Sequence, residues 1–137
     1  MKNAVIAETF RKIGFMIEIE ENEENATFKA RAYKRTSDII ASLSTNIEEI
    51  YRKEGLEGLQ KIPSIGKAIA LKIEEYILTG KIRYFEELKA TTPINIDDFY
   101  GLESIGPKTI KILYDKLRIK NLELRIRRCL SFLILNS

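Results

Sequence analysis

Apolar residues recur every three or four positions along most of the chain, which is the spacing that one face of an α-helix presents. The first such stretch runs from Ala4 to about Glu20 and follows Asn3, a residue type that often caps helices. Its apolar positions are Val5, Ile6, Phe10, Ile13 and Ile17. The pattern predicts a helix here, followed by an acidic connector that ends near Ala26.

The same spacing predicts further helices downstream. One would be capped by Thr27 and would bury an apolar face made of Phe28, Ala32, Ile39, Ile40 and Leu43. Asn46 would open a short third helix that ends near Gly55. No stretch alternates with the two-residue period of a half-buried strand for long enough to predict one. The chain is therefore expected to be all-α.

One short turn sequence occurs twice, forty residues apart. Ser64-Ile65-Gly66 is identical to Ser104-Ile105-Gly106, and each copy is followed by apolar residues at helical spacing. The glycine would let the backbone turn sharply and come close to a ligand, and the start of the next helix would offer unpaired N–H groups to an anion. The pattern resembles the helix-hairpin-helix motif, a sequence-independent binder of the DNA phosphate backbone. A plain loop between packed helices is the alternative for either copy. In both copies a serine stands where the motif prefers its first glycine; it keeps the backbone donor but restricts the backbone angles of the turn.

Length and composition remove several classes of protein. The 137 residues, 45% of them apolar, suffice for one domain or two very small ones. The longest runs without a charge are nine residues, about half of the ~20 that a membrane span requires, so no membrane partner is expected. Glu8 interrupts the only candidate for a secretory signal, so we expect a cytoplasmic protein. Histidine is absent and Cys129 is the only cysteine, which excludes disulfide frameworks, Cys/His zinc sites and histidine-dependent triads.

The charges are unevenly distributed. The net charge is +3, but residues 1–26 carry three basic and six acidic groups, and the remainder carries twenty and fourteen. No acidic residue lies between Asn25 and Ser37, a segment that contains four basic side chains. This asymmetry favours a polyanionic partner that meets one basic face.

From about residue 4 to residue 120, the order of these features resembles the amino-terminal part of the DNA polymerase X family. The likeness is carried by residues 28–35, 62–76, 79–81 and 102–108. The resemblance implies a compact helical bundle with two helix-hairpin-helix motifs. It divides the chain into a lyase-like domain with the first motif at residues 1–80, a subdomain with the second motif at 81–120, and an atypical apolar tail at 121–137.

The resemblance also implies roles for individual residues. Lys72 matches the lyase lysine, which forms a Schiff base with the sugar left at a 5′ end. The residues that match or accompany the DNA and 5′-phosphate contacts are Lys29, Arg31, Tyr33, Lys34, Arg35, Ser64, Gly66, Lys67, Ser104, Gly106 and Lys108. A monovalent cation, Na⁺ or K⁺, is implied at the main-chain carbonyls of Gln60, Ile62, Ile65, Tyr100, Leu102 and Ile105. No cofactor is implied for the lyase step.

Lysine chemistry makes the first of these roles testable. A lysine attacks an aldehyde only as the neutral amine, and burial and nearby cations both increase the fraction of that form. Lys72 lies at the margin of an apolar stripe, and Lys29 and Arg31 would add like charge if they face it. Glu75, one turn beyond Lys72, is a candidate proton acceptor.

We therefore expect the DNA-binding part of a family X polymerase, which binds gapped, nicked or abasic DNA at the 5′-phosphate and acts as a deoxyribose-phosphate lyase in base-excision repair. The chain ends before the metal-binding carboxylates of a polymerase palm could begin, so it should not synthesise DNA by itself. Whether it is a fragment or a stand-alone protein, its oligomeric state and the role of its tail are left open. One alternative is a non-catalytic helix-hairpin-helix module in which Lys72 only contacts phosphate. Another is a helical interaction protein with no nucleic-acid role.

Overall fold

A computed structural model describes residues 2–20, 24–92, 94–100 and 106–117, and all the regular secondary structure in these ranges is α-helical. This confirms the predicted all-α fold class. The helices are α1 (Lys2–Glu20), α2 (Glu24–Ser42), α3 (Ile47–Gln60), α4 (Lys67–Thr79), α5 (Arg83–Thr91), α6 (Ile96–Phe99) and α7 (Pro107–Leu117). Within these ranges, no helix is both long and apolar enough to cross a membrane.

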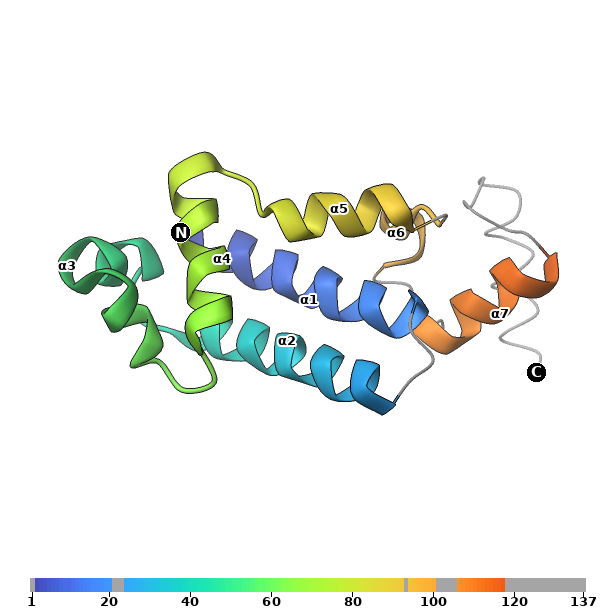
Figure 1. Cartoon of the computed structure of the whole chain (residues 1–137), viewed down its shortest axis with the longest axis horizontal. Helices are drawn as coiled ribbons and strands as arrows, with labels where there is room; N and C mark the ends of the chain where they lie inside the picture. Colours follow the sequence, from blue (N-terminus) through green and yellow to red (C-terminus); the bar gives the residue numbers. More distant parts are fainter. Residues whose placement is uncertain (1, 21–23, 93, 101–105, 118–137) are drawn as a thin grey trace.

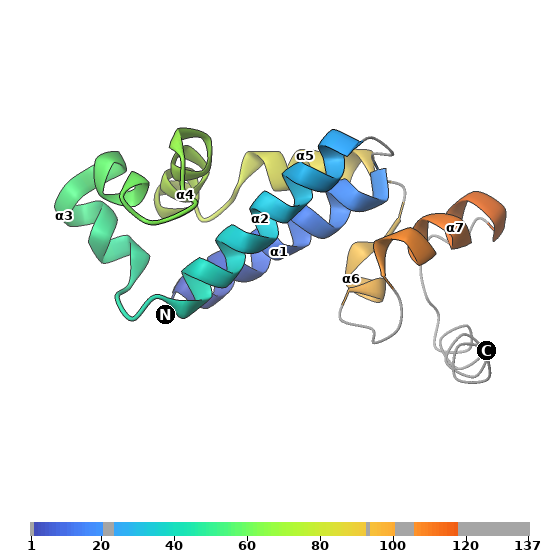
Figure 2. The ribbon, with the colours of Figure 1, turned by 90° about the horizontal axis from the view of Figure 1, so that it is seen from below.

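The two longest helices form the centre of the molecule. α1 and α2 lie side by side and antiparallel, and α5 runs along α1 (Figures 1 and 2). α3 and α4 pack at the end where α1 begins, while α6 and α7 pack at the end where α1 stops. The start of α4 and the start of α7 therefore lie near opposite ends of α1.

Small residues let α1 and α2 approach closely. A Cβ atom added to Gly14 would lie 3.0 Å from the Ala30 carbonyl oxygen on α2. At the buried crossing, the Ser37 hydroxyl donates a hydrogen bond of 2.6 Å to the carbonyl of Ala7. The face of α2 that meets α1 is thus built from small and polar residues as well as from apolar ones.

This packing corrects the predicted face of the second helix. α2 begins at Glu24, so Thr27 lies inside its first turn and does not cap it. Phe28 and Ala32, predicted to be buried, are exposed. Because α2 turns its small residues toward α1, the larger Phe28 faces solvent; the buried positions of α2 are Ala26, Ala30, Tyr33, Thr36, Ser37 and Ile40.

Asn3 does not cap α1 as predicted but binds the loop before α3. α1 begins at Lys2, so Asn3 is inside the helix and not its cap. Its buried side chain donates to the Thr45 carbonyl at 2.9 Å and accepts from the Ile47 amide at 2.8 Å. These two bonds fasten the loop before α3 to the start of α1.

The predicted caps of the next helices are confirmed. The Asn46 side chain accepts from the Glu48 amide at 3.1 Å and caps α3, and Gly80 ends α4 in the left-handed region with φ 78°. α3 does not end near Gly55 as predicted. It kinks there, at φ 64° and ψ −151°, and continues to Gln60.

Two apolar clusters hold the bundle together. The larger cluster contains residues of α1, α2, α3 and α4, together with Ile82 before α5. The smaller cluster consists of Met16, Ile19, Ile94, Ile96, Phe99 and Ile110. Phe85 and Leu88 of α5 pack against both clusters, so α5 links the two ends of the molecule. The boundary predicted after residue 80 falls in the turn before α5. Residues 118–120 and the predicted apolar tail at 121–137 lie outside the described residues.

Candidate nucleic-acid interface

Lys72 lies on α4 at the edge of the larger apolar cluster. Ala70 and Ile73 of the same helix are fully buried, whereas Lys72 is only partly buried, as its place beside the apolar stripe predicted. Its Nζ atom lies 5.2 Å from the centre of the Tyr84 ring. The amine therefore lies at the boundary between the core and solvent.

Lys29 reaches the same ring from α2. Its Nζ atom also lies 5.2 Å from the Tyr84 ring centre. Burial lowers the pKa of Lys72, and the charge of Lys29 lowers it further, while Glu75 acts in the opposite direction. The structure thus brings Lys29 and Lys72 together, and their environment favours the neutral amine of Lys72.

Tyr33 forms the inner wall of this site. Its ring stacks between Phe10, at 5.9 Å, and Tyr84, at 6.1 Å. Burial raises its pKa to about 12, with a smaller contribution from Tyr84, so its phenol stays protonated at neutral pH. Tyr33 therefore stacks on the ring that both lysines contact.

The sequence did not single out Tyr84, the residue that both lysines contact. It lies in the first turn of α5, where the Arg83 amide donates a hydrogen bond of 2.9 Å to Glu75 Oε1. That bond ties the start of α5 to α4 and holds the candidate proton acceptor, Glu75, in place. The available signal was the spacing of Tyr84 and Leu88, which share one face of a helix at i and i+4.

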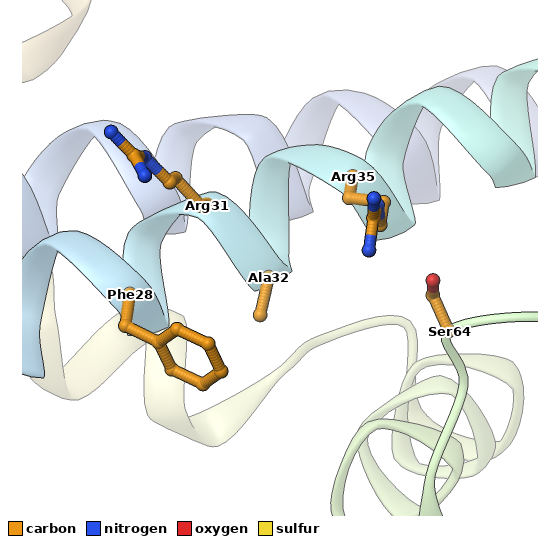
Figure 3. A pocket seen from close by; sticks show the side chains of 5 residues that line it. All are labelled: Phe28, Arg31, Ala32, Arg35 and Ser64. Carbon is orange, nitrogen blue, oxygen red and sulfur yellow. The ribbon is translucent and has the colours of Figure 1, made fainter.

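A second group of basic side chains lies on the outward face of α2. Arg31 and Arg35 line a hollow of about 410 Å³ together with Phe28, Ala32 and Ser64, the last of which comes from the loop before α4 (Figure 3). Phe28 is 78% exposed, and neither arginine forms an ion pair with any residue that the structure describes. Arg31 therefore belongs to this hollow, and the like charge that acts on Lys72 comes from Lys29.

Lys34 lies apart from both groups. Its Nζ atom pairs with Glu18 Oε1 at 2.6 Å, and it lines a separate hollow with Arg11, Phe15, Asp38 and Tyr100. The structure does not bring Lys34 to Lys29 or to the arginines of the first hollow.

The loop before α4 corrects one detail of the predicted turn. The left-handed residue is Ser64, at φ 67°, and not Gly66, which is extended at φ −88° and ψ −176°. A Cβ atom on Gly66 would meet no atom within 4 Å. Contacts within the described protein therefore do not require a glycine here. The open space next to it leaves the backbone accessible to a ligand.

The start of α4 presents unpaired amides to solvent. Gly66 is its N-cap and supplies no side-chain hydrogen bond, and Lys67 and Ala68 in its first turn are exposed. The first amides of a helix have no partner within it and carry a partial positive charge. Together with the Lys67 ammonium, they can hold an anion such as a phosphate.

Only the flanks of the second hairpin are described. Residues 101–105 come between α6 and α7 in the sequence, and the predicted contacts of Leu102, Ser104 and Ile105 lie outside the described residues. Gly106 and Lys108, at the start of α7, are exposed, and a Cβ atom on Gly106 would also meet no atom within 4 Å.

Only some of the carbonyl groups implied for a monovalent cation belong to described residues. Those of Gln60, Ile62 and Ile65 belong to the end of α3 and the loop before α4, and the Ile62 oxygen accepts from the Ile65 amide at 3.1 Å. A carbonyl oxygen has two lone pairs, so that bond leaves one free for an ion. Tyr100 directly follows α6 at the second hairpin.

Comparisons with known proteins agree with this architecture. The model of a family described as helix-hairpin-helix domain matches residues 1–82. DNA polymerase lambda of Arabidopsis thaliana is 28% identical to this chain over 86 residues, which are 62% of the chain and 15% of that protein. The chain thus spans only a small part of the length of this relative.

Proposed function

Because the chain belongs to the helix-hairpin-helix domain family and is similar at its amino-terminal end to a family X polymerase, we propose that it binds DNA and carries 5′-deoxyribose-phosphate lyase activity. The observation that carries the proposal is the pair of amines of Lys29 and Lys72 on one aromatic ring, where burial and like charge lower the pKa of Lys72. A lysine that only contacts phosphate needs the charged form, whereas this environment favours the neutral form.

DNA binding would use two neighbouring groups of exposed residues, one at the start of α4 and one along α2. The start of α4, with Gly66 and Lys67, binds a backbone phosphate through main-chain amides and one ammonium group. The hollow around Arg31 and Arg35 binds a neighbouring stretch of the strand, because its exposed phenylalanine offers a surface on which a base stacks beside two phosphate-binding cations. All these contacts are independent of base sequence.

The chemical step would proceed through an imine at Lys72. The Nζ lone pair attacks the aldehyde carbon of the ring-opened sugar, and loss of water gives a protonated imine. A proton then leaves the adjacent sugar carbon, the C–H electrons form a C=C bond to the next carbon, and the C–O bond at that carbon breaks so that its electron pair leaves with the phosphate at the 5′ end of the DNA strand. Water then hydrolyses the imine, which frees the sugar and regenerates the Lys72 amine. Lys29 would hold the 5′-phosphate, and burial together with the charge of Lys29 increases the fraction of Lys72 that is in the neutral form.

Two further groups have supporting roles in this proposal. Glu75 lies close enough to Lys72 to influence its pKa, and its carboxylate is held by the Arg83 amide, so it is the proposed proton acceptor. Na⁺ or K⁺ would be held by the carbonyls of Gln60, Ile62 and Ile65 and would bridge the loop to a DNA phosphate, outside the lyase step.

Borohydride trapping tests the proposal. The full chain is mixed with gapped duplex DNA that carries a 5′-deoxyribose phosphate at the gap, and borohydride reduces any imine to a stable covalent adduct. We expect an adduct with the unsubstituted chain and none with Lys72→Ala. Lys89→Ala is the matched control, because Lys89 also lies over an aromatic ring, at 4.6 Å from Phe85, but outside the site.

The outcomes separate the three functional hypotheses. A Lys72-dependent adduct supports the lyase. Salt-sensitive DNA binding without an adduct would leave a non-catalytic binding module, and no DNA binding at low salt would leave a helical interaction protein.

A further inference from the structure

The geometry of the lysine pair points to a positioning residue. Resting on the lyase function proposed above, we infer that Tyr84 presents the Lys72 amine to the sugar by holding the amines of Lys72 and Lys29 against one ring. The inference rests on distances and packing within the described site.

Both amines are equally far from the ring. Each Nζ atom lies 5.2 Å from the Tyr84 ring centre, one arriving from α2 and the other from α4. Two ammonium groups repel each other, and long lysine side chains would otherwise spread into solvent. An aromatic face attracts cations, so a shared ring offsets part of this repulsion and confines both amines.

The Tyr84 ring is held in place by two further aromatic rings, and the three together form an aromatic column. Phe10 of α1, Tyr33 of α2 and Tyr84 of α5 stack in sequence, with ring centres 5.9 Å and 6.1 Å apart and planes 20° and 21° apart. Phe10 is fully buried and Tyr33 is 6% exposed, so the column leads from the core to the partly exposed Tyr84. Displacement of the Tyr84 ring from its position would disrupt this stacking.

The backbone of Tyr84 is fixed as well. Ile82, two residues earlier, is 1% exposed and packs in the larger apolar cluster. The amide of Arg83 donates to Glu75 Oε1, one turn beyond Lys72 on α4. The helix that carries Tyr84 is thus fastened to the helix that carries Lys72 at the level of the site.

The expected consequence is a loss of rate with little loss of DNA binding. Tyr84→Met keeps an apolar side chain of similar length but removes the ring, whereas Tyr84→Phe keeps the ring and removes only the hydroxyl. At saturating DNA we expect Tyr84→Met to slow single-turnover borohydride trapping roughly tenfold, the size expected for loss of a partly desolvated cation–aromatic contact. Tyr84→Phe should restore a rate within about twofold of the unsubstituted chain.

A purely structural role is separated by a second readout. In NMR titrations of the free protein with ¹³C-labelled lysine, Lys29→Gln should raise the pKa of Lys72, because a neighbouring positive charge has been removed. If the ring holds the pair together, the same substitution should raise that pKa by less in the Tyr84→Met background. Phe85→Leu is the matched control. It removes the next aromatic ring of α5, over which the Lys89 amine lies, and it should leave the effect of Lys29 on the pKa of Lys72 unchanged.

The outcomes distinguish the inference from the function on which it rests. Trapping by Tyr84→Met at the rate of the unsubstituted chain, or undiminished coupling of the lysines, overturns the role of Tyr84 and leaves the lyase intact. Absence of any adduct from the unsubstituted chain overturns the lyase and this inference with it. If Tyr84→Met does not fold, the ring-current shifts of the Lys29 and Lys72 methylenes in the unsubstituted chain decide: upfield positions support the inference, and random-coil positions overturn it.

Discussion

Ser64 occupies a backbone conformation that favours glycine. It has φ 67°, in the left-handed region, and it is the only non-glycine residue with positive φ among those described. Its carbonyl oxygen accepts from the buried Thr36 hydroxyl at 3.4 Å, so the strained turn is also tied to α2. The serine keeps its conformation at a cost that a glycine would not have.

Replacing this serine should therefore stabilise the protein. A left-handed conformation costs a residue with a Cβ about 1–2 kcal/mol, and a glycine gives back about 0.5–1 kcal/mol of that through its freer unfolded chain. We expect Ser64→Gly to raise the free energy of unfolding by about 0.5–1 kcal/mol in urea titrations. Ser44→Gly, an exposed loop serine without positive φ, should lower it slightly; equal effects of the two changes would contradict the strain at Ser64.

The charge of Lys29 should contribute to the pH dependence of trapping, in addition to burial of Lys72. Since that charge lowers the pKa of Lys72, Lys29→Gln should raise it and leave less neutral amine at pH 7. The acidic limb of the plot of trapping rate against pH should then move to higher pH, measured at saturating DNA. Lys89→Gln serves as the control and should not move it. A limb that shifts to lower pH, or does not shift, would contradict the coupling.

At the scale of residues, the sequence indicated candidate site residues but not the neighbours that each of them has in the fold. The resemblance implied that Lys29, Lys72 and Tyr33 belong to one site, and the structure places both lysines at the Tyr84 ring, on which Tyr33 stacks. It could not assign Arg31 or Lys34 to a side of α2, because that depends on which face packs against α1. Small residues such as Ala30 decided it, and a hydrophobicity pattern gives them little weight. Tyr84 was missed for a similar reason, since its importance comes from neighbours on two other helices.

At the scale of elements, helix starts provide part of the proposed phosphate binding. The caps at Asn46 and Gly80 were predictable because each follows from the local chemistry of one residue. The continuation of α3 beyond Gly55 was not, since Gly58 and Leu59 are held there by burial. The start of α4 has the predicted glycine, Gly66, but not the conformation expected of it. The left-handed residue of the turn is Ser64, two positions before that glycine.

Adding bulk at Gly66 should impair binding without unfolding the protein. Its backbone is extended and its Cβ position is open, so Gly66→Val should lower the free energy of unfolding by no more than about 1 kcal/mol, the value of a weakened cap. The branched side chain would stand between the first amides of α4 and a phosphate. We expect DNA affinity to fall roughly tenfold or more, the equivalent of a lost charge-assisted hydrogen bond, as measured by fluorescence anisotropy. Ala90→Val on the exposed end of α5 is the control; unchanged affinity of Gly66→Val would refute the use of these amides.

At the scale of the whole molecule, the two described helix starts that could bind phosphate lie far apart. The start of α4 and the start of α7 lie near opposite ends of α1 (Figure 1). α1 has 19 residues and is thus about 28 Å long, and phosphates on one strand follow each other at about 3.4 Å. A strand that touches both helix starts must therefore extend over about eight nucleotides. Each hairpin would hold a different part of the DNA.

This separation predicts a dependence on DNA length. On a 5′-phosphorylated duplex of about 16 base pairs, Gly106→Val should weaken binding, whereas on one of about 6 base pairs it should have no effect. Gly66→Val should weaken binding to both. Dissociation constants and their salt dependence can be measured on the same duplexes, and the longer one should show the steeper dependence because more phosphates are contacted. An equal effect of Gly106→Val on both lengths would contradict the arrangement.

The central claim is that Lys72 is the residue that becomes covalently attached to the sugar. The most direct measurement is to trap the unsubstituted chain with borohydride on gapped DNA that carries a 5′-deoxyribose phosphate, digest the adduct, and locate the modified lysine by mass spectrometry. The account predicts that the modification lies on Lys72. Attachment at another lysine, or no adduct at all, would contradict it.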